Sequence, residues 1–157
     1  MAIYTDKIFP SSGETGAGGG IIQVVNATST TNNVYNGGTG SWYDMQPQPS
    51  ITLHQSSNKV LIFVTCGLQM EWCGQTGFKL LRGSTEVTQA QGYCWNNTRW
   101  QYAPAPFSGV VDSPGSTGPH TYKVQTRTSR NATLNWNSGH GSTTNGTAQI
   151  TLMEFSS

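Results

Sequence analysis

The segment Tyr93–Tyr102, YCWNNTRWQY, carries the side chains best suited to contact a ligand or another protein. Aromatic faces beside amides are suited to sugars, and the same residue types are enriched in protein interfaces. Three interpretations stay open: a hairpin whose aromatics plug the end of a barrel, a contact within an oligomer or larger assembly, and a glycan-binding surface. The residues that would make the contact are Trp95, Asn97, Arg99, Trp100 and Tyr102.

No spacing in the sequence assembles a catalytic, cofactor or metal site. The motifs GxSxG and HExxH are absent, and none of the three histidines has a carboxylate within four positions. A glycosidase-type pair of carboxylates could still meet in space, because sequence separation does not forbid it. The glycines at 16–20 precede a predicted strand, whereas a phosphate loop follows a strand and opens a helix. We therefore expect no enzymatic activity, no cofactor and no metal.

The three cysteines, Cys66, Cys73 and Cys94, form no CxxC pair. An odd number at these spacings is typical neither of a disulfide framework nor of a zinc site. We expect small buried thiols in a reducing compartment, and no disulfide within the chain.

Charge and hydropathy exclude two classes of partner, nucleic acid and a membrane. Eight Lys and Arg against seven Asp and Glu leave no basic field for nucleic acid. The longest apolar run, Val60–Val64, is far shorter than the roughly 20 residues of a membrane span. The N-terminus lacks the apolar region of a signal peptide, so we expect synthesis in the cytoplasm.

The elements that must position these residues are strands. Charged residues are 10% of the 157, against about 25% in ordinary domains, and no window has the apolar period of a helix. Apolar residues alternate with polar ones in several short runs separated by Gly, Ser and Asn turns, which is typical of a β-sandwich or barrel. The runs are 21–25, 50–54, 77–82, 107–111, 120–128, 131–136 and 147–152.

The run Lys59–Cys66 is different because it is apolar on both faces. One face, with Val60 and Ile62, can fill a core, whereas the other carries Leu61 and Phe63. Either loops cover this second face of a central strand, or it contacts another subunit, since a bare apolar stripe favours aggregation. In the second case we expect aromatic residues near it, Trp42 or Phe155, to share the contact.

The first 20 residues form a separate unit in the sequence. They carry Ile3, Tyr4, Ile8 and Phe9, followed by a Gly/Ser-rich linker. We predict that residues 1–20 are an N-terminal attachment arm, which gains stability only by docking on its own oligomer or on a larger assembly. Residues 21–157 then form one globular domain.

Five segments follow one another in an order that resembles a known family. They are IIQVV (21–25), SITLHQSSNKVLIFVTCGLQ (50–69), FKLLRGSTEV (78–87), FSGVVDSPGSTGPHTYKVQTRTS (107–129) and AQITLMEF (148–155). The order is similar to that of small virion structural proteins of marine and freshwater bacteriophages, which are often labelled tail-fibre or structural proteins. The resemblance covers about residues 20–155, and the chain departs from it at 93–102 and at Cys73 and Cys94.

The resemblance implies a jelly-roll β-sandwich similar to the trimeric complement-globular and tumour-necrosis-factor type, on the surface of a virion made in a host bacterium. Among virion roles, the short arm favours a capsid decoration or cement protein that binds the major capsid protein. A receptor-binding tail or head fibre protein, which contacts a host-surface glycan through residues 93–102, is the alternative. A glycan-active enzyme is the third hypothesis.

Overall fold

The computed structural model describes residues 20–31, 33–36, 40–71, 74–94, 101–104, 107–128, 133–136 and 146–156. These residues form strands and turns without any helix, which confirms the predicted all-β class. None of them belongs to a helix long and apolar enough to cross a membrane. The strands are β1 (Ile21–Ser29), β2 (Asn33–Asn36), β3 (Tyr43–Asp44), β4 (Ser50–Thr52), β5 (Lys59–Thr65), β6 (Gly67–Glu71), β7 (Gly74–Arg82), β8 (Thr85–Cys94), β9 (Gln101–Pro104), β10 (Ser108–Asp112), β11 (Pro119–Thr128), β12 (Thr133–Trp136) and β13 (Ala148–Phe155).

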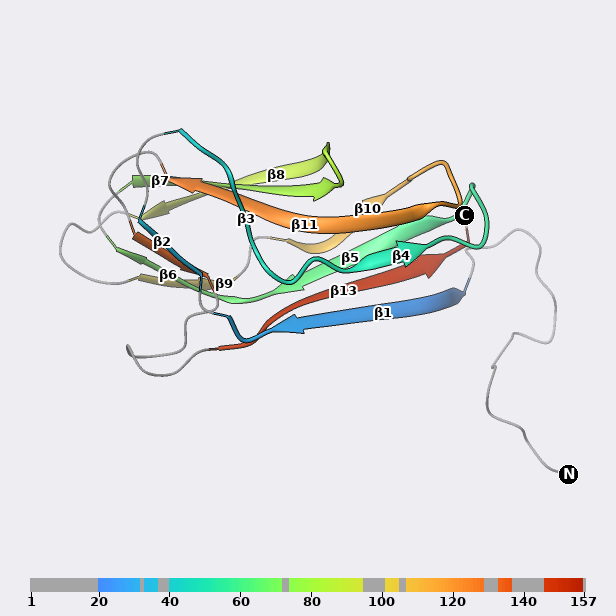
Figure 1. Cartoon of the computed structure of the whole chain (residues 1–157), viewed down its shortest axis with the longest axis horizontal. Helices are drawn as coiled ribbons and strands as arrows, with labels where there is room; N and C mark the ends of the chain where they lie inside the picture. The colour runs from blue at the N-terminus through green and yellow to red at the C-terminus, as the bar shows by residue number, and fades with distance from the viewer. Residues whose placement is uncertain are drawn as a thin grey trace, which may run out of the picture.

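Two antiparallel sheets form the layers of a β-sandwich (Figure 1). One sheet has the order β1-β13-β5-β10. The other has the order β3-β11-β7-β8, and β4 also pairs with β11. A further sheet, β2-β12-β6-β9, uses the chain segments next to β1, β13, β5 and β10 in the same order. The four-stranded arrangement is therefore repeated beyond the end of the first sheet.

The antiparallel pairs are nested in the sequence. β1 pairs with β13, β3 and β4 pair with β11, β5 pairs with β10, and β7 pairs with β8. The innermost pair is a hairpin whose turn contains Gly83 at φ 58°, a conformation that glycine adopts without a steric penalty. Pairing of β13 with β5 and of β11 with β7 joins these pairs into the two sheets.

Alternation along the strands builds one core between the sheets. In β5, β11 and β13, every second residue is buried, because successive side chains point to opposite faces. The inward face predicted for Lys59–Cys66, with Val60 and Ile62, is confirmed, and the core also includes Ile51, Leu53 and the indole of Trp136. These buried residues are Ile51, Leu53, Val60, Ile62, Val64, Tyr122, Val124, Thr126, Trp136, Ala148, Ile150 and Leu152.

Most of Tyr93–Tyr102 lies outside the described residues, and the structure describes only the strand ends on either side of 95–100. Tyr93 and Cys94 end β8, which pairs with β7, whereas Gln101 and Tyr102 begin β9, which pairs with β6. The strands on either side of the segment therefore lie in different sheets, and the segment connects them. A run rich in aromatic residues cannot tell a turn between paired strands from a crossing between sheets, because partner choice is not a local property.

Candidate functional site

The outer face of β1-β13-β5-β10 carries a continuous apolar row. In the register of the sheet, Val24 lies opposite Met153, Met153 opposite Leu61, and Leu61 opposite Val111. We call these four residues the apolar row; they cross all four strands. Val24 is 54% exposed and Val111 is 50% exposed. Their strands are the two edges of the sheet, so the row reaches from edge to edge.

Neighbouring positions extend the apolar row along the sheet. Phe63 pairs with Thr151 and Ser108 in the adjacent register, and Phe155 pairs with Ile21 and Lys59 at the other side. Ile21 is 62% exposed. Monomeric proteins rarely expose a contiguous apolar surface of this kind unless it contacts something.

The structure separates the residues predicted for an oligomer contact. Leu61, Phe63 and Phe155 occupy outward positions on β5 and β13 in the same sheet. Trp42 lies instead on the outer face of the other sheet, where it contacts residues of β7 and β11. The other members of the apolar row were missed, although the alternation of β13 and β10 contained the signal.

Trp42 lies close to two cations. The Lys79 ammonium lies 4.7 Å from the centroid of the indole ring, and the Arg127 guanidinium carbon lies 4.8 Å from it. Both cations are attracted by the electron-rich ring face. A Cβ atom at Gly77 would lie only 3.0 Å from Cη2 of Trp42, so glycine leaves room for the ring beside the strand.

The remaining predicted site residues lie largely outside the described residues. Trp95, Asn97, Arg99 and Trp100 belong to this group, and of Tyr102 only the backbone is described, paired with Gln69. The arm residues Ile3, Tyr4, Ile8 and Phe9 also lie outside. Among the cysteines, Cys66 is buried and its thiol donates to the Gly67 carbonyl oxygen at 3.2 Å.

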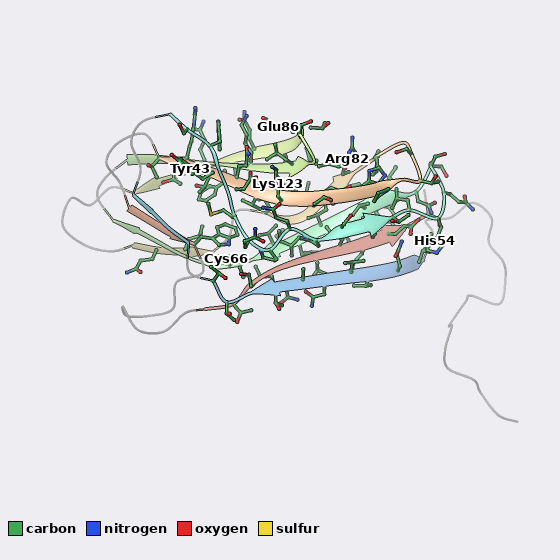
Figure 2. The ribbon with its side chains drawn as sticks, viewed as in Figure 1. Tyr43, His54, Cys66, Arg82, Glu86 and Lys123 are labelled. Atoms are coloured by element: carbon green, nitrogen blue, oxygen red, sulfur yellow. The ribbon has the colours of Figure 1, made fainter. Side chains whose placement is uncertain are left out.

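The sequence did not predict a buried carboxylate cluster at one end of the sandwich. Glu154 on β13 is fully buried and accepts four hydrogen bonds. Asn58 Nδ2 donates at 2.6 Å, the His54 backbone N–H at 2.7 Å, and Gln23 Nε2 at 2.5 Å. His54 Nδ1 lies 2.8 Å from Glu154 Oε2. Figure 2 labels His54 at this end of the sandwich. The cluster joins β1, the β4–β5 connection and β13.

These donors keep Glu154 ionised. Burial by itself would raise the pKa of the carboxyl group, but the hydrogen bonds from Asn58, His54 and Gln23 outweigh it and lower the pKa to about 2. His54 and Glu154 are 100 residues apart, so spacing could not have found the pair. One weak signal was present: Glu154 occupies an inward position of the alternating run 148–155.

A second polar cluster closes the sandwich at β10. Asp112 Oδ2 accepts from Arg82 Nη1 at 2.6 Å and from the Tyr122 hydroxyl at 2.7 Å. Burial and the bond to Asp112 raise the pKa of Tyr122, which is fully buried. Asp112 ends β10, and its carboxylate joins that strand to Arg82 of β7 and Tyr122 of β11.

Comparison with known proteins places the chain in no family. No family model and no curated protein sequence matches it. Among solved structures, it is similar to a chain in the "Structure of infectious bursal disease virus Gx strain", with 13% sequence identity and a TM-score of 0.39. The match covers 86% of this chain and 37% of that chain. Likeness at this level assigns neither a family nor a function.

Proposed function

We propose that this chain is a non-enzymatic structural protein of a bacteriophage virion and that it assembles as a homotrimer. The observation that carries the assembly is the apolar row, Val24–Met153–Leu61–Val111, on one face of the sandwich. The virion role is supported by the five segments whose order resembles small phage structural proteins. In the proposed trimer, a neighbouring copy covers the row and removes its apolar side chains from water.

The nested strand pairs support a jelly-roll of the complement-globular and tumour-necrosis-factor type. β3 and β4 can be counted as one interrupted strand. The nested pairs of the two sandwich sheets are then β1 with β13, β3/β4 with β11, β5 with β10, and the β7–β8 hairpin in the middle. A long hairpin of such pairs, rolled so that alternate pairs fall in opposite sheets, generates the double-sheet jelly-roll. β1 and β5 with their partners lie in one sheet, and β3/β4 and β7 with theirs lie in the other.

Light scattering after size exclusion tests the trimer. At micromolar concentration we expect a mass of about 51 kDa, three times the chain mass of 16.9 kDa. A stable species at the mass of one chain would contradict the assembly. A stable dimer would show that the apolar row meets one copy of itself and would also contradict the trimer.

Within the virion we propose capsid decoration, with the arm at 1–20 binding the major capsid protein. The four large apolar side chains of the arm gain stability only by burial, and three arms on one trimer would bind with higher avidity than one. Removal of residues 1–20 should leave the assembled domain intact but unable to join particles that lack the protein. Equal occupancy by truncated and full-length protein would show that the globular domain makes the attachment.

The alternative role is receptor or glycan binding by a tail or head fibre, with residues 93–102 as the contact. Labelled antibody on intact virions separates the two roles, because decoration predicts label on the capsid and the alternative predicts label on fibres or the tail. The proposal assigns structural roles to the four carboxylates whose side chains are described. Asp44 pairs with Lys123, Glu86 with Lys79 and Asp112 with Arg82. Glu154 accepts hydrogen bonds from Asn58 and Gln23. A glycosidase needs two carboxylates that can act on a substrate.

A further inference from the structure

The outer face of the five-stranded sheet contains a hollow of about 540 Å³. It lies over β11 and β7, between the segment that links β3 to β4 and the β7–β8 turn. Ligand pockets for small molecules typically have volumes of about 300–1,000 Å³. The side chains that line the hollow are Gln48, Leu81, Ser84, Thr121, Lys123 and Gln125.

Backbone hydrogen bonds hold both walls of the hollow in place. On one side, the Met45 N–H donates to the Val124 carbonyl at 2.8 Å, and the Tyr122 N–H donates to the Pro49 carbonyl at 2.9 Å. The arch between these two bonds carries Gln48. On the other side, the Gly83 N–H donates to the Thr121 carbonyl at 2.8 Å. The walls are therefore preformed, which lowers the entropic cost of binding.

The floor of the hollow is apolar. Leu81 pairs with Lys123 across β7 and β11 and is 7% exposed. Phe78 and Leu80 are inward residues of β7, so the alternation of the strand places Leu81 on the outer side of the sheet. An apolar floor within a polar rim fits the C–H face of a pyranose ring, whose hydroxyls point to the sides.

The polar side chains of the rim are already oriented by Asp44. Lys123 Nζ donates to Asp44 Oδ2 at 2.8 Å, and Gln125 Nε2 donates to Oδ1 at 2.7 Å. Because the Gln125 amide nitrogen faces Asp44, its carbonyl oxygen can accept a bond from a ligand hydroxyl. Lys123 has further N–H groups to donate, and its charge is balanced by Asp44. The rim therefore offers both donors and acceptors without an uncompensated cation.

We propose that this hollow binds one neutral pyranose unit of a carbohydrate. The balance of charge favours a neutral sugar over a phosphate or another anion, which would need a cation without a partner. The site is separate from residues 93–102 and lies on the sheet opposite the apolar row. Sugar binding and assembly through the apolar row can therefore occur together, and neither depends on the other.

The test uses full-length protein and three probes: methyl α-D-glucopyranoside, methyl α-D-galactopyranoside and N-acetyl-D-glucosamine. Saturation-transfer NMR should detect at least one of them at millimolar concentration. Ser84→Trp, which fills the hollow from an exposed turn, should weaken that binding at least tenfold. Thr121→Val removes one rim hydroxyl from an exposed strand position and should weaken binding about fivefold.

Ser56→Trp is the matched control, since Ser56 is also an exposed turn serine but lies outside the hollow. It should leave binding unchanged, and thermal melts of all three variants should resemble that of the parent chain. Absence of binding by all three probes would overturn the proposal. Binding that survives Ser84→Trp but is lost in Trp95→Ala would overturn it as well and would assign the sugar contact to residues 93–102.

Discussion

The two sheets of the sandwich distribute charge and apolar surface in opposite ways. The sheet β1-β13-β5-β10 buries a carboxylate, Glu154, and presents the apolar row on its outer face. The sheet formed by β11, β7, β8, β3 and β4 presents Lys79 and Lys123 on its outer face. In Figure 2, Lys123 lies in the layer of β11 and His54 lies at the end of the sandwich near the C-terminus.

The difference shows which sheet can face water without a partner. Outward charges on the five-stranded sheet find partners within the chain, as Lys79 does in Glu86 at 2.6 Å. The exposed apolar residues Val24 and Val111 gain stability only when another surface removes them from water. Of the two outer faces, the apolar one is therefore the better candidate for a permanent contact.

The largest effect is expected from removing the buried carboxylate. Glu154→Leu leaves the Asn58 amide and the His54 backbone N–H without their acceptor, so the free energy of unfolding should fall by about 2–5 kcal/mol. Asp44→Asn changes a carboxylate on the outer face and should cost less than about 1 kcal/mol. Urea denaturation of both variants measures the difference. Equal losses of unfolding free energy in the two variants would show that the buried carboxylate stabilises the chain no more than the exposed one.

A charge on the apolar row should disrupt assembly. Leu61→Glu places a carboxylate at the centre of the row, and the concentration at which the trimer half-dissociates should rise at least 100-fold, equivalent to about 5.5 kcal/mol per trimer. Gln89→Glu adds the same charge at an exposed position of β8, opposite Lys79, and should leave assembly unchanged. Sedimentation velocity over a dilution series measures both. If only Gln89→Glu dissociates the assembly, the contact lies on the sheet that contains β8, and the proposed contact through the apolar row is wrong.

Acid should weaken the domain chiefly through Glu154. Its pKa is about 2 in the folded chain and 4.5 in the absence of its partners, so its stabilisation is complete above pH 4.5 and is lost as the pH falls toward 2. The effect should be smaller than that of Glu154→Leu because protonation keeps the shape of the side chain. Partial burial would raise the pKa of Asp44, but Lys123 and Gln125 hold it below its usual value, so Asp44 acts in the same direction.

Chemical denaturation between pH 6 and pH 2 measures this dependence. In Glu154→Gln, the decline of stability below pH 4.5 should be clearly shallower than in the parent chain. A decline of the same slope in both proteins would mean that other carboxylates, and not the buried cluster, control acid stability.

The smallest effect is expected where Trp42 crosses β7. Gly77→Ala introduces a methyl group 3.0 Å from Cη2 of Trp42, and crowding should lower stability by about 1 kcal/mol. Gly118→Ala is the matched control, since nothing lies within 4 Å of its added Cβ. In a Trp42→Leu background, the cost of Gly77→Ala should vanish. If Gly77→Ala still lowers stability in the Trp42→Leu background, the loss arises from the backbone at residue 77 and not from crowding against Trp42.

The sequence predicted the strands that alternate regularly. Burial at every second position of β11 and β13 follows from the geometry of one strand, so Tyr122 and Ile150 could be assigned to the core without knowing their neighbours. The strand β8 was not predicted, because Thr85–Cys94 is polar along most of its length and its alternation is weak. Its pairing with β7 through a tight turn makes it a strand.

The contacts that join distant strands could not be predicted in this way. The approach of Glu154 to His54, the placement of Trp42 over Gly77, and the alignment of Val24 with Met153 and Leu61 all depend on which strands pair and in which register. Local propensity and periodicity act over a few residues, whereas register is decided by the joint burial of the whole core. The all-β class follows from the local pattern, but the apolar row, the buried carboxylate and the hollow over β11 exist only in the assembled sandwich.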